Sequence, residues 1–360
     1  MSALRDEIAA IIAQDGPITL ERYMSLALSH PTLGYYMTRD PFGAGGDFIT
    51  APEISQMFGE LVGLWAQEAW RAAGAPAPAH LIELGPGRGT LMSDVLRVAR
   101  ISPPFFDAID AHLVETSPVL EAVQRRTLAD VETPIGWSAD IALAPQGPAI
   151  ILANEFFDAL PARHFVKTAR GWSERLVGLD DAGALVFGVP DHVEQDLKIA
   201  APEGSIIEVG AIAARLMSEI AARLVAQGGA LLVVDYGHTR TTLGETLQAV
   251  ARHAYVDPLA EPGEADLTTH LDFAALARAA TSAGARVQGP VTQGAFLTQL
   301  GIAQRAEALQ RRATPAQSAD IALALERLAG AGDPTRNMGE LFKAMAVTHP
   351  AMPDLPGFYA

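Results

Sequence analysis

The chain has 360 residues, of which 49% are hydrophobic and 19% charged, and its formal net charge is −16 at pH 7. This apolar content is sufficient for a sizeable core in one large domain. The absence of cysteine excludes disulfides, thiolate metal sites and cysteine nucleophiles, and the negative field disfavours nucleic acid as a partner while it favours a basic protein segment.

Residues 1–79 are predicted to form an N-terminal region of helices and a loop. Apolar side chains recur at helical spacing over residues 4–12, and a second helix is predicted over 19–28. The turn-rich stretch 41–48 is either a lid over a site or an ordinary surface loop. Residues 50–53 have the spacing of a capping box and are expected to open a further helix.

From residue 80 onwards, short apolar runs alternate with helical segments. This pattern predicts an α/β fold with a Rossmann-like, doubly wound sheet, in two segments at 80–164 and 208–300. Residues 165–207 alternate like antiparallel strands and are expected to be a β-rich insertion, and residues 301–360 are expected to be a C-terminal helical tail. No apolar run reaches the roughly 18 residues of a membrane span. The expected strands are 80–84, 111–115, 149–153, 230–235 and 286–291.

The strongest local signal is a glycine-rich turn at the end of the first expected strand. Glu83 precedes Gly85, Gly87 and Gly89, and a helix is predicted to begin at Thr90. Glycines let the backbone turn tightly and approach a ligand closely. A dinucleotide fingerprint would require a small residue at Thr90, and no Gly-Lys-Ser/Thr follows for a phosphate loop. The turn therefore predicts binding of S-adenosylmethionine, the alternative being a tight turn with no ligand.

Two further acids follow later strands in the expected order. Glu115 ends the second strand, where it could accept hydrogen bonds from both ribose hydroxyls of the cofactor. The alternative is that Glu115 only caps the following helix. Asp140 follows a third short element and is expected to accept from the adenine amino group, or else is an ordinary loop aspartate.

The end of the fourth strand carries the catalytic candidates, because a sheet of this type presents its reactive groups there. These candidates are Asn154, Glu155 and Asp158. Polar side chains after an apolar strand are costly to bury unless something pairs with them. Asp158 could instead bond only to nearby backbone. Asp235 and His238, after another strand, either face the pocket or organise its loop.

Metal binding is not expected at His253, His270 or Asp272, because their spacing does not match a metal-binding pattern. Asp272 is predicted instead to be the N-cap of a helix. The oligomeric state is not predicted.

Several of these stretches together resemble the MidA family, over roughly residues 17–300. The family contains a mitochondrial complex I assembly factor that acts as a protein arginine methyltransferase. The resemblance implies a domain that binds S-adenosylmethionine, with extra helices over its pocket. The matching stretches are 46–55, 83–89, 154–161, 235–238, 257–259 and 263–268.

The resemblance also implies methylation of an arginine, on a core subunit of respiratory complex I. If so, Glu155 is the first candidate to grip the guanidinium, with Asp158 or Asp47 second. Asp47 and Phe48 belong to the loop at 43–48 that, with Tyr35 and Tyr36, could form a lid. The first 16 residues lack the bias of a presequence, so we expect a bacterial cytoplasmic protein. Two alternatives stay open: a cofactor-binding assembly chaperone without turnover, and a methyltransferase for a small molecule.

Overall fold

The computed structural model describes residues 2–43, 47, 49–333 and 336–359. The strands of its largest sheet are β2 (Ala79–Leu84), β3 (Ile109–Val114), β4 (Ile135–Ser138), β5 (Ala149–Asn154), β11 (Gly229–His238), β15 (Leu271–Asp272), β16 (Arg286–Thr292) and β17 (Phe342–Thr348). Their order is β16-β17-β11-β5-β2-β3-β4, and β15 pairs with the end of β11. The strands from β4 to β11 are parallel, whereas β17 is antiparallel to both of its neighbours.

Alternation along the strands gives the sheet two apolar faces. Leu231 and Val233 on β11 belong to one core cluster, and Leu232 and Val234 to the other. The helices of the two layers pack against these faces, as a doubly wound sheet requires. One face is covered by α5 (Gln56–Ala72), α6 (Thr90–Ala99), α7 (Pro103–Phe106), α11 (Gln293–Gln299) and α12 (Ile302–Gln310), and the other by α9 (Ala211–Gln227) and α10 (Phe273–Ser282). The Rossmann-like expectation is confirmed.

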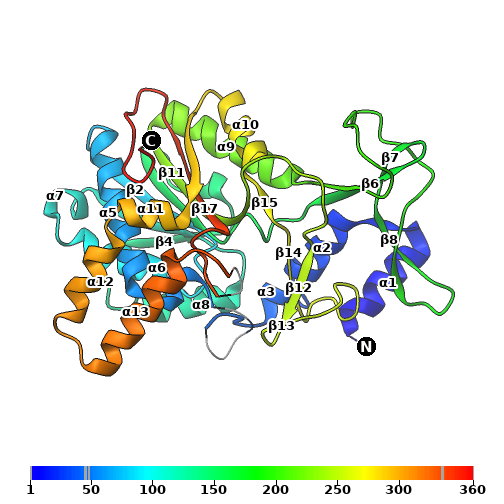
Figure 1. The fold of residues 1–360 in the computed structure, drawn as a ribbon, viewed down its shortest axis with the longest axis horizontal. Coiled ribbons are helices and arrows are strands. Elements are labelled where there is room, and N and C mark those ends of the chain that lie inside the picture. Colours follow the sequence, from blue (N-terminus) through cyan, green and yellow to red (C-terminus); the bar gives the residue numbers. More distant parts are fainter. Residues whose placement is uncertain (1, 44–46, 48, 334–335, 360) are drawn as a thin grey trace.

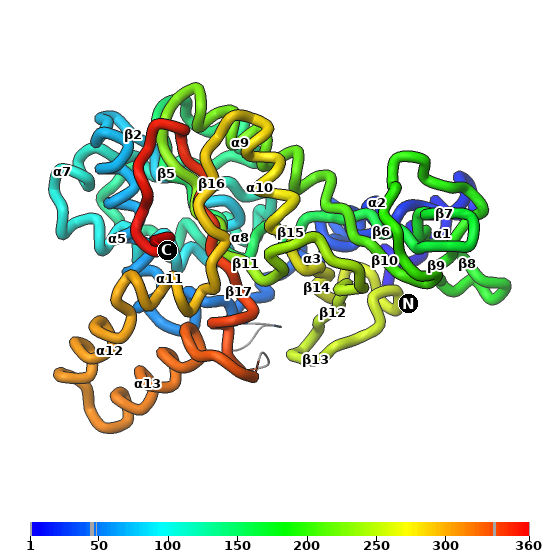
Figure 2. Tube along the Cα trace, turned by 45° about the horizontal axis from the view of Figure 1, so that its top comes forward, coloured from blue at the N-terminus to red at the C-terminus, as the bar shows by residue number. Residues whose placement is uncertain are grey.

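A second lobe lies beside the sheet (Figure 1). Its core joins Ile8 and Met24 near the N-terminus to Val177 and Leu267, which are distant in sequence. Both views place the N-terminal helices next to the small antiparallel sheets (Figure 2). Its elements are α1 (Ala3–Asp15), β1 (Ile18–Thr19), α2 (Leu20–Ser29), α3 (Tyr35–Thr38), β6 (Arg163–Thr168), β7 (Gly171–Glu174), β8 (Leu176–Leu179), β9 (Leu185–Gly188), β10 (Ile206–Val209), β12 (Gln248–Ala251), β13 (Ala254–Tyr255) and β14 (Asp266–Thr268).

This arrangement differs from the predicted division of the chain. The N-terminal region splits, because the apolar side of α5 packs on the central sheet while α1 and α2 join the second lobe. Strands β12 to β14, predicted within the Rossmann-like segment 208–300, also contribute to the second lobe. None of the helices within the described ranges is long and apolar enough to cross a membrane.

The predicted helical tail at 301–360 is only partly helical. After α12 and α13 (Pro315–Ala329) the chain returns to the central sheet as β17, inserted between β11 and β16. Met345 and Val347 face one core cluster, and Ala344 and Ala346 face the other. The strand is buried on both faces, so the tail is part of the core.

The helix predicted to open at residues 50–53 is interrupted. The Thr50 side chain makes no capping hydrogen bond, and the short helix α4 (Ala51–Ile54) ends before Ser55. The Ser55 hydroxyl then begins α5 by accepting from the backbone N–H of Met57. Glu53 accepts instead from the Thr90 hydroxyl, which ties α4 to the first turn of α6. The remaining elements are α8 (Pro118–Thr127) and the short 3₁₀ helix η1 (Ile141–Leu143).

The burial of β17 generates a test of its structural role. Met345 is 0% exposed, so Met345→Ala should lower the free energy of unfolding by about 2–5 kcal/mol. The control is Leu323→Ala on α13, because Leu323 is 69% exposed and its truncation should cost no more than about 0.5 kcal/mol. Urea denaturation of both variants makes the comparison. Equal stabilities would show that the strand is dispensable.

Candidate active site

The carboxyl ends of β2, β3 and β5 meet at one edge of the sheet, where they border a cavity of about 250 Å³. Residues that follow these strands form its floor, and residues from α2 to Phe42 cover it. Strand ends of a parallel sheet are where such folds bind ligands. The principal wall residues are Ser29, Tyr36, Phe42, Gly85, Gly87, Glu115, Ala139, Glu155 and Phe156.

The glycine turn is shaped for close approach. Gly85, Gly87 and Gly89 have φ values of 58°, 53° and 81°, a region that side chains with a β-carbon rarely adopt. A β-carbon at Gly85 would lie 2.7 Å from the Phe156 ring. Gly89 is the N-cap of α6, so the turn brings the positive end of that helix to the cavity.

Glu83 borders a second, smaller cavity that shares Gly85, Gly87 and Glu155 with the first. Its carboxyl is buried, which raises its pKa well above the ordinary value. In the described part of the chain, Glu83 Oε2 and Asn154 Oδ1 are both buried without a hydrogen-bond partner. Two orphaned acceptors beside one small cavity fit an ammonium donor, such as the amino group at the methionine end of S-adenosylmethionine.

Glu115 is oriented before any ligand arrives. Its Oε1 accepts from the Ser117 backbone N–H at 2.7 Å, and its Oε2 accepts from Gln124 Nε2 at 2.9 Å. Gln124 also donates to the carbonyl of Gly87 at 2.8 Å, so this acid and the glycine turn are held together. Ser117, not Glu115, is the N-cap of α8. Burial raises the pKa of the Glu115 carboxyl.

Asp140 makes a local contact rather than a cavity contact. Its exposed carboxylate accepts from the backbone N–H of Ala142 at 2.8 Å and caps η1. The preceding residue, Ala139, lines the larger cavity. The short loop therefore presents Ala139 to the ligand space. The contacts of Asp140 are those expected of an ordinary loop aspartate.

Glu155 stands on the wall that the two cavities share. Its backbone has a φ of 48°, an unusual conformation for a residue with a side chain. Its Oε1 accepts from the backbone N–H of Ala51 at 3.0 Å and from Asn154 Nδ2 at 3.2 Å. Burial raises the pKa of the Glu155 carboxyl to about 7. The carboxylate is thus aligned by two neutral donors.

Asp235 organises the loop that carries these residues. Its side chain is buried, and its Oδ2 accepts from the backbone N–H groups of Phe157 and Asp158 at 3.1 and 3.2 Å. Its Oδ1 accepts from the Tyr236 N–H at 2.8 Å. Of the two interpretations of Asp235, the structure supports the one in which its side chain organises the loop. His238 borders a different cavity.

Asp158 is buried at the end of this loop. Its carboxylate hydrogen-bonds with the Tyr236 side chain, and burial raises its pKa to about 6. Its Oδ1 has no hydrogen-bond partner in the described part of the chain. Asp158 itself lines neither of the two cavities described above, whereas Phe156 and Ala159 on either side of it line the larger one.

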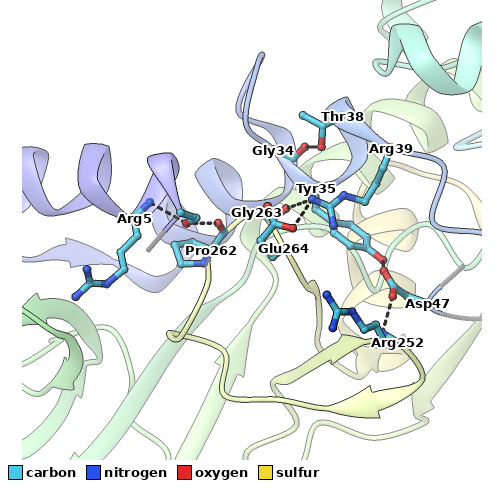
Figure 3. Close-up of polar contacts among 11 residues, drawn as sticks. Arg5, Gly34, Tyr35, Thr38, Arg39, Asp47, Arg252, Pro262, Gly263 and Glu264 are labelled. Carbon is cyan, nitrogen blue, oxygen red and sulfur yellow. Dashed lines mark hydrogen bonds and ion pairs between the residues drawn. The ribbon is translucent and has the colours of Figure 1, made fainter.

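Asp47 joins two parts of the second lobe, α3 and the turn between β12 and β13. The Tyr35 hydroxyl donates to its Oδ2 at 2.6 Å, and the backbone N–H of Arg252 donates to its Oδ1 (Figure 3). Asp47 lines neither of the two cavities described above. Its contacts fasten a cover over the site. Phe48, predicted beside it, lies outside the described residues.

Sequence reasoning did not predict the contacts that Tyr36, Phe42 and Asp266 make in this region. Tyr36 lines the larger cavity, and its ring stacks on that of Phe42 at a centroid distance of 6.4 Å. The Tyr36 hydroxyl donates to Asp266 Oδ1 at 2.8 Å. The available signal was a single acid, Asp266, at the start of a buried strand.

Asp272 is the N-cap of α10, since its carboxylate accepts from the Ala275 N–H at 2.9 Å. This confirms the predicted capping role. In the ranges that the structure describes, no group of three or more His, Cys, Asp or Glu side chains is arranged to hold a metal ion.

The geometry of the glycine turn predicts how it can be blocked. Gly87→Val places a branched side chain in the cavity wall and should abolish binding of S-adenosylmethionine. Gly183→Val is the control, because Gly183 also has a positive φ of 77° but has open space around it. Both variants should lose stability, and only Gly87→Val should lose binding in titration calorimetry. Parental affinity in Gly87→Val would mean that the cofactor binds elsewhere.

The position of Glu115 predicts a contribution to ribose binding. Glu115→Ala removes charge-assisted hydrogen bonds worth roughly 1.5–3 kcal/mol each, so the dissociation constant of S-adenosylmethionine should rise at least about tenfold. Glu121→Ala, at a half-buried acid on α8, should leave it unchanged. A change of less than about threefold for Glu115→Ala would contradict the assignment.

Comparison with known proteins agrees with this site. Residues 61–291 match the family model described as "Putative S-adenosyl-L-methionine-dependent methyltransferase". Those residues include the glycine turn, Glu115 and the stretch from Asn154 to Asp158.

Curated relatives match over most of the chain. The mitochondrial protein arginine methyltransferase NDUFAF7 of Danio rerio is 39% identical over 96% of this chain and 86% of that protein. The human protein of the same name is 37% identical over 83% of this chain and 73% of that protein.

A solved structure matches the whole fold. A crystal structure of a protein from Burkholderia thailandensis, bound to S-adenosyl-homocysteine, has a TM-score of 0.86 and 30% identity, and covers 99% of this chain and 94% of that chain. A second crystal structure of a protein from that organism has a TM-score of 0.83.

The prediction of a bacterial cytoplasmic location is wrong, because the curated relatives are mitochondrial proteins. That prediction depended on the composition of the first 16 residues, which is a weaker guide than likeness along the chain. The cavities, the orphaned acceptors and the comparisons agree on the cofactor, S-adenosylmethionine. The chain belongs to the NDUFAF7, or MidA, family of S-adenosylmethionine-dependent methyltransferases.

Proposed function

We propose that this methyltransferase modifies an arginine side chain of a protein substrate. The observation that carries the proposal is the Glu155 carboxylate, aligned by Ala51 and Asn154 at the junction of the two cavities. No ion pair joins this carboxylate to a cationic side chain of the described residues. Relatives named protein arginine methyltransferase support the same acceptor.

Each of the two connected cavities holds a different part of the cofactor. Glu83 and Asn154 offer acceptors to its amino-acid end, while Glu115 offers acceptors to its ribose. When bound, S-adenosylmethionine supplies an electrophilic methyl group on a sulfonium. Glu155 stands on the wall between the two ends. Phe42 and Tyr36 cover the larger cavity and help to exclude water.

Glu155 has two tasks toward an arginine. A carboxylate can hold a guanidinium through two parallel hydrogen bonds, which orients the nitrogen that is to be methylated. A guanidinium that gains a methyl group on nitrogen must also release one proton. The Glu155 carboxyl, whose pKa is raised to about 7, can accept that proton at neutral pH.

The proposed substrate is a core subunit of respiratory complex I, which follows from the resemblance to the MidA family. The net charge of −16 supports a basic substrate segment. Mass spectrometry of complex I subunits, from cells with and without the protein, tests this choice. A methylarginine that disappears without the protein is expected. Identical methylation in both samples would overturn the choice of subunit.

Glu155→Gln tests the acceptor role. The variant keeps the size of the side chain but removes its charge, so methyl transfer should fall at least about tenfold, which is 1.4 kcal/mol. The affinity for S-adenosylmethionine should change by less than about threefold. Transfer of labelled methyl to proteins of a cell extract measures turnover, and calorimetry measures binding on the same preparation.

The matched control is Glu121→Gln, at a half-buried carboxylate on α8 that pairs with Arg125. It should behave like the parent protein. Full activity in Glu155→Gln would remove Glu155 from the mechanism. Tight cofactor binding by the parent without any label transfer would favour a chaperone without turnover.

A further inference from the structure

Three buried or half-buried tyrosines donate their hydroxyls to three carboxylates around the active site. Each carboxylate is therefore held by a neutral donor, and none of the three forms an ion pair with a cationic side chain of the described chain. The pairs are Tyr35 with Asp47, Tyr36 with Asp266 and Tyr236 with Asp158.

Asp266 is the least expected member of this group. It is 6% exposed and begins the buried strand β14, whose other residues are Leu267 and Thr268. Its carboxylate accepts from the Tyr36 hydroxyl and from the Leu267 backbone N–H. Burying a carboxylate near other carboxylates is costly unless a cation compensates them. A site of this kind is suited to a positively charged guest.

Asp158 supplies a second and independent observation. It is 5% exposed, and its Oδ1 is buried with no hydrogen-bond partner in the described part of the chain. Buried polar atoms are nearly always paired, so an orphaned carboxylate oxygen in the segment between the cavity-lining residues Phe156 and Ala159 indicates a missing donor.

The chain holds Asp158 and Asp266 in one wall. The Tyr236 hydroxyl hydrogen-bonds with both Asp158 and Thr268, which is two residues from Asp266. The Thr269 backbone N–H also donates to the carbonyl of Asp158 at 3.2 Å. Glu155, three residues before Asp158, continues this wall to the cofactor cavities.

We propose that Asp158 and Asp266 form the binding wall for the guanidinium of the methyl acceptor. The open Oδ1 of Asp158 accepts an N–H of the guanidinium, and Asp266 compensates its charge from the side of Tyr36. The Tyr36 hydroxyl fixes the orientation of Asp266 and is a positioning residue. This inference rests on the proposed function, since it takes the acceptor to be an arginine.

Titration of the wall follows from its burial. Burial raises the pKa of Asp266 to about 8 and that of Asp158 to about 6, and the charge of Asp158 raises the pKa of the Asp235 and Asp266 carboxyls further. A cation binds the deprotonated wall. Arginine binding should therefore be weak below pH 6, strengthen as the pH rises through 6 to 8, and level off above.

The pKa values of other titratable groups around the wall are also shifted, each for an identifiable cause. Burial raises the pKa values of the three tyrosines, which keeps them neutral hydrogen-bond donors in this range. The Coulomb effect of Arg327 lowers the pKa of Glu155 slightly against the effect of burial. The charged or titratable neighbours are Tyr35, Tyr36, Tyr236, Asp47, Glu155, Asp235, Arg39 and Arg327.

The test compares two peptides on the full chain saturated with S-adenosyl-homocysteine. The probes are acetyl-Gly-Arg-Gly-amide and the same peptide with citrulline, which has nearly the same shape but no charge. The parent should bind the arginine peptide at least about tenfold more tightly, and Asp266→Asn should remove that preference. Asp181→Asn, an exposed aspartate in the hairpin between β8 and β9, is the control and should keep it.

Three outcomes would overturn the proposal that Asp158 and Asp266 bind the guanidinium. They are an unchanged preference in Asp266→Asn, equal binding of both peptides by the parent, and no binding of either peptide. In each case, intact binding of S-adenosyl-homocysteine would show that the assignment as a methyltransferase is unaffected.

The pH profile of the parent keeps the test valid if Asp266→Asn fails to fold. The affinity for the arginine peptide should rise between pH 6 and pH 8, while that for the citrulline peptide stays flat. A flat arginine profile would also overturn the inference. By contrast, labelled methyl groups found only on residues other than arginine would refute the proposed function.

Discussion

The site depends on one buried carboxylate, Asp235, which receives three backbone N–H groups at the end of β11. Two of those groups belong to Phe157 and Asp158, in the loop that follows β5. Because both strands are parallel neighbours, this clamp fixes where the loop leaves the sheet. Glu155, with its positive φ, and the buried Asp158 both lie in that loop.

Neutral donors, rather than cations, hold the acids of this site. Backbone N–H groups serve Asp235, an amide serves Glu155, and tyrosine hydroxyls serve Asp158 and Asp266. Such donors orient a carboxylate without pairing its charge, so the wall attracts a cationic acceptor once it is deprotonated. A fixed lysine or arginine in the same place would compete with the substrate. The cost is a set of raised pKa values, which couples acceptor binding to pH.

The second lobe covers the site with residues that are distant from the sheet edge in sequence. Tyr36 covers the larger cavity, and Asp47 fastens the region around Tyr35 to the turn at Arg252. These contacts join segments that are far apart in sequence. Figure 3 shows the contacts of Asp47 with Tyr35 and Arg252 within this cover.

Local patterns were sufficient to predict the sheet edge. The glycine turn, Glu115 and the stretch from Asn154 to Asp158 each follow an apolar strand, and the geometry of parallel strands brings such ends together. The bond between Tyr36 and Asp266 joins residues 230 positions apart, and no local pattern encodes it.

Two other features also depended on tertiary contacts. β17 is a short run of small and apolar residues after two helices, and only its pairing with β11 and β16 makes it a strand. The role predicted for Asp140 assumed that its side chain faces the ligand space. In the structure one of its carboxylate oxygens caps η1 by accepting from the Ala142 backbone N–H, and the adenine contact stays a prediction.

A crystal structure of the protein with S-adenosyl-homocysteine and an arginine peptide tests this account most directly. The account predicts guanidinium nitrogens at roughly 2.7–2.9 Å from the carboxylates of Glu155 and Asp158, with Asp266 behind them. A guanidinium bound at another surface, with the Oδ1 of Asp158 still unpaired, would contradict it.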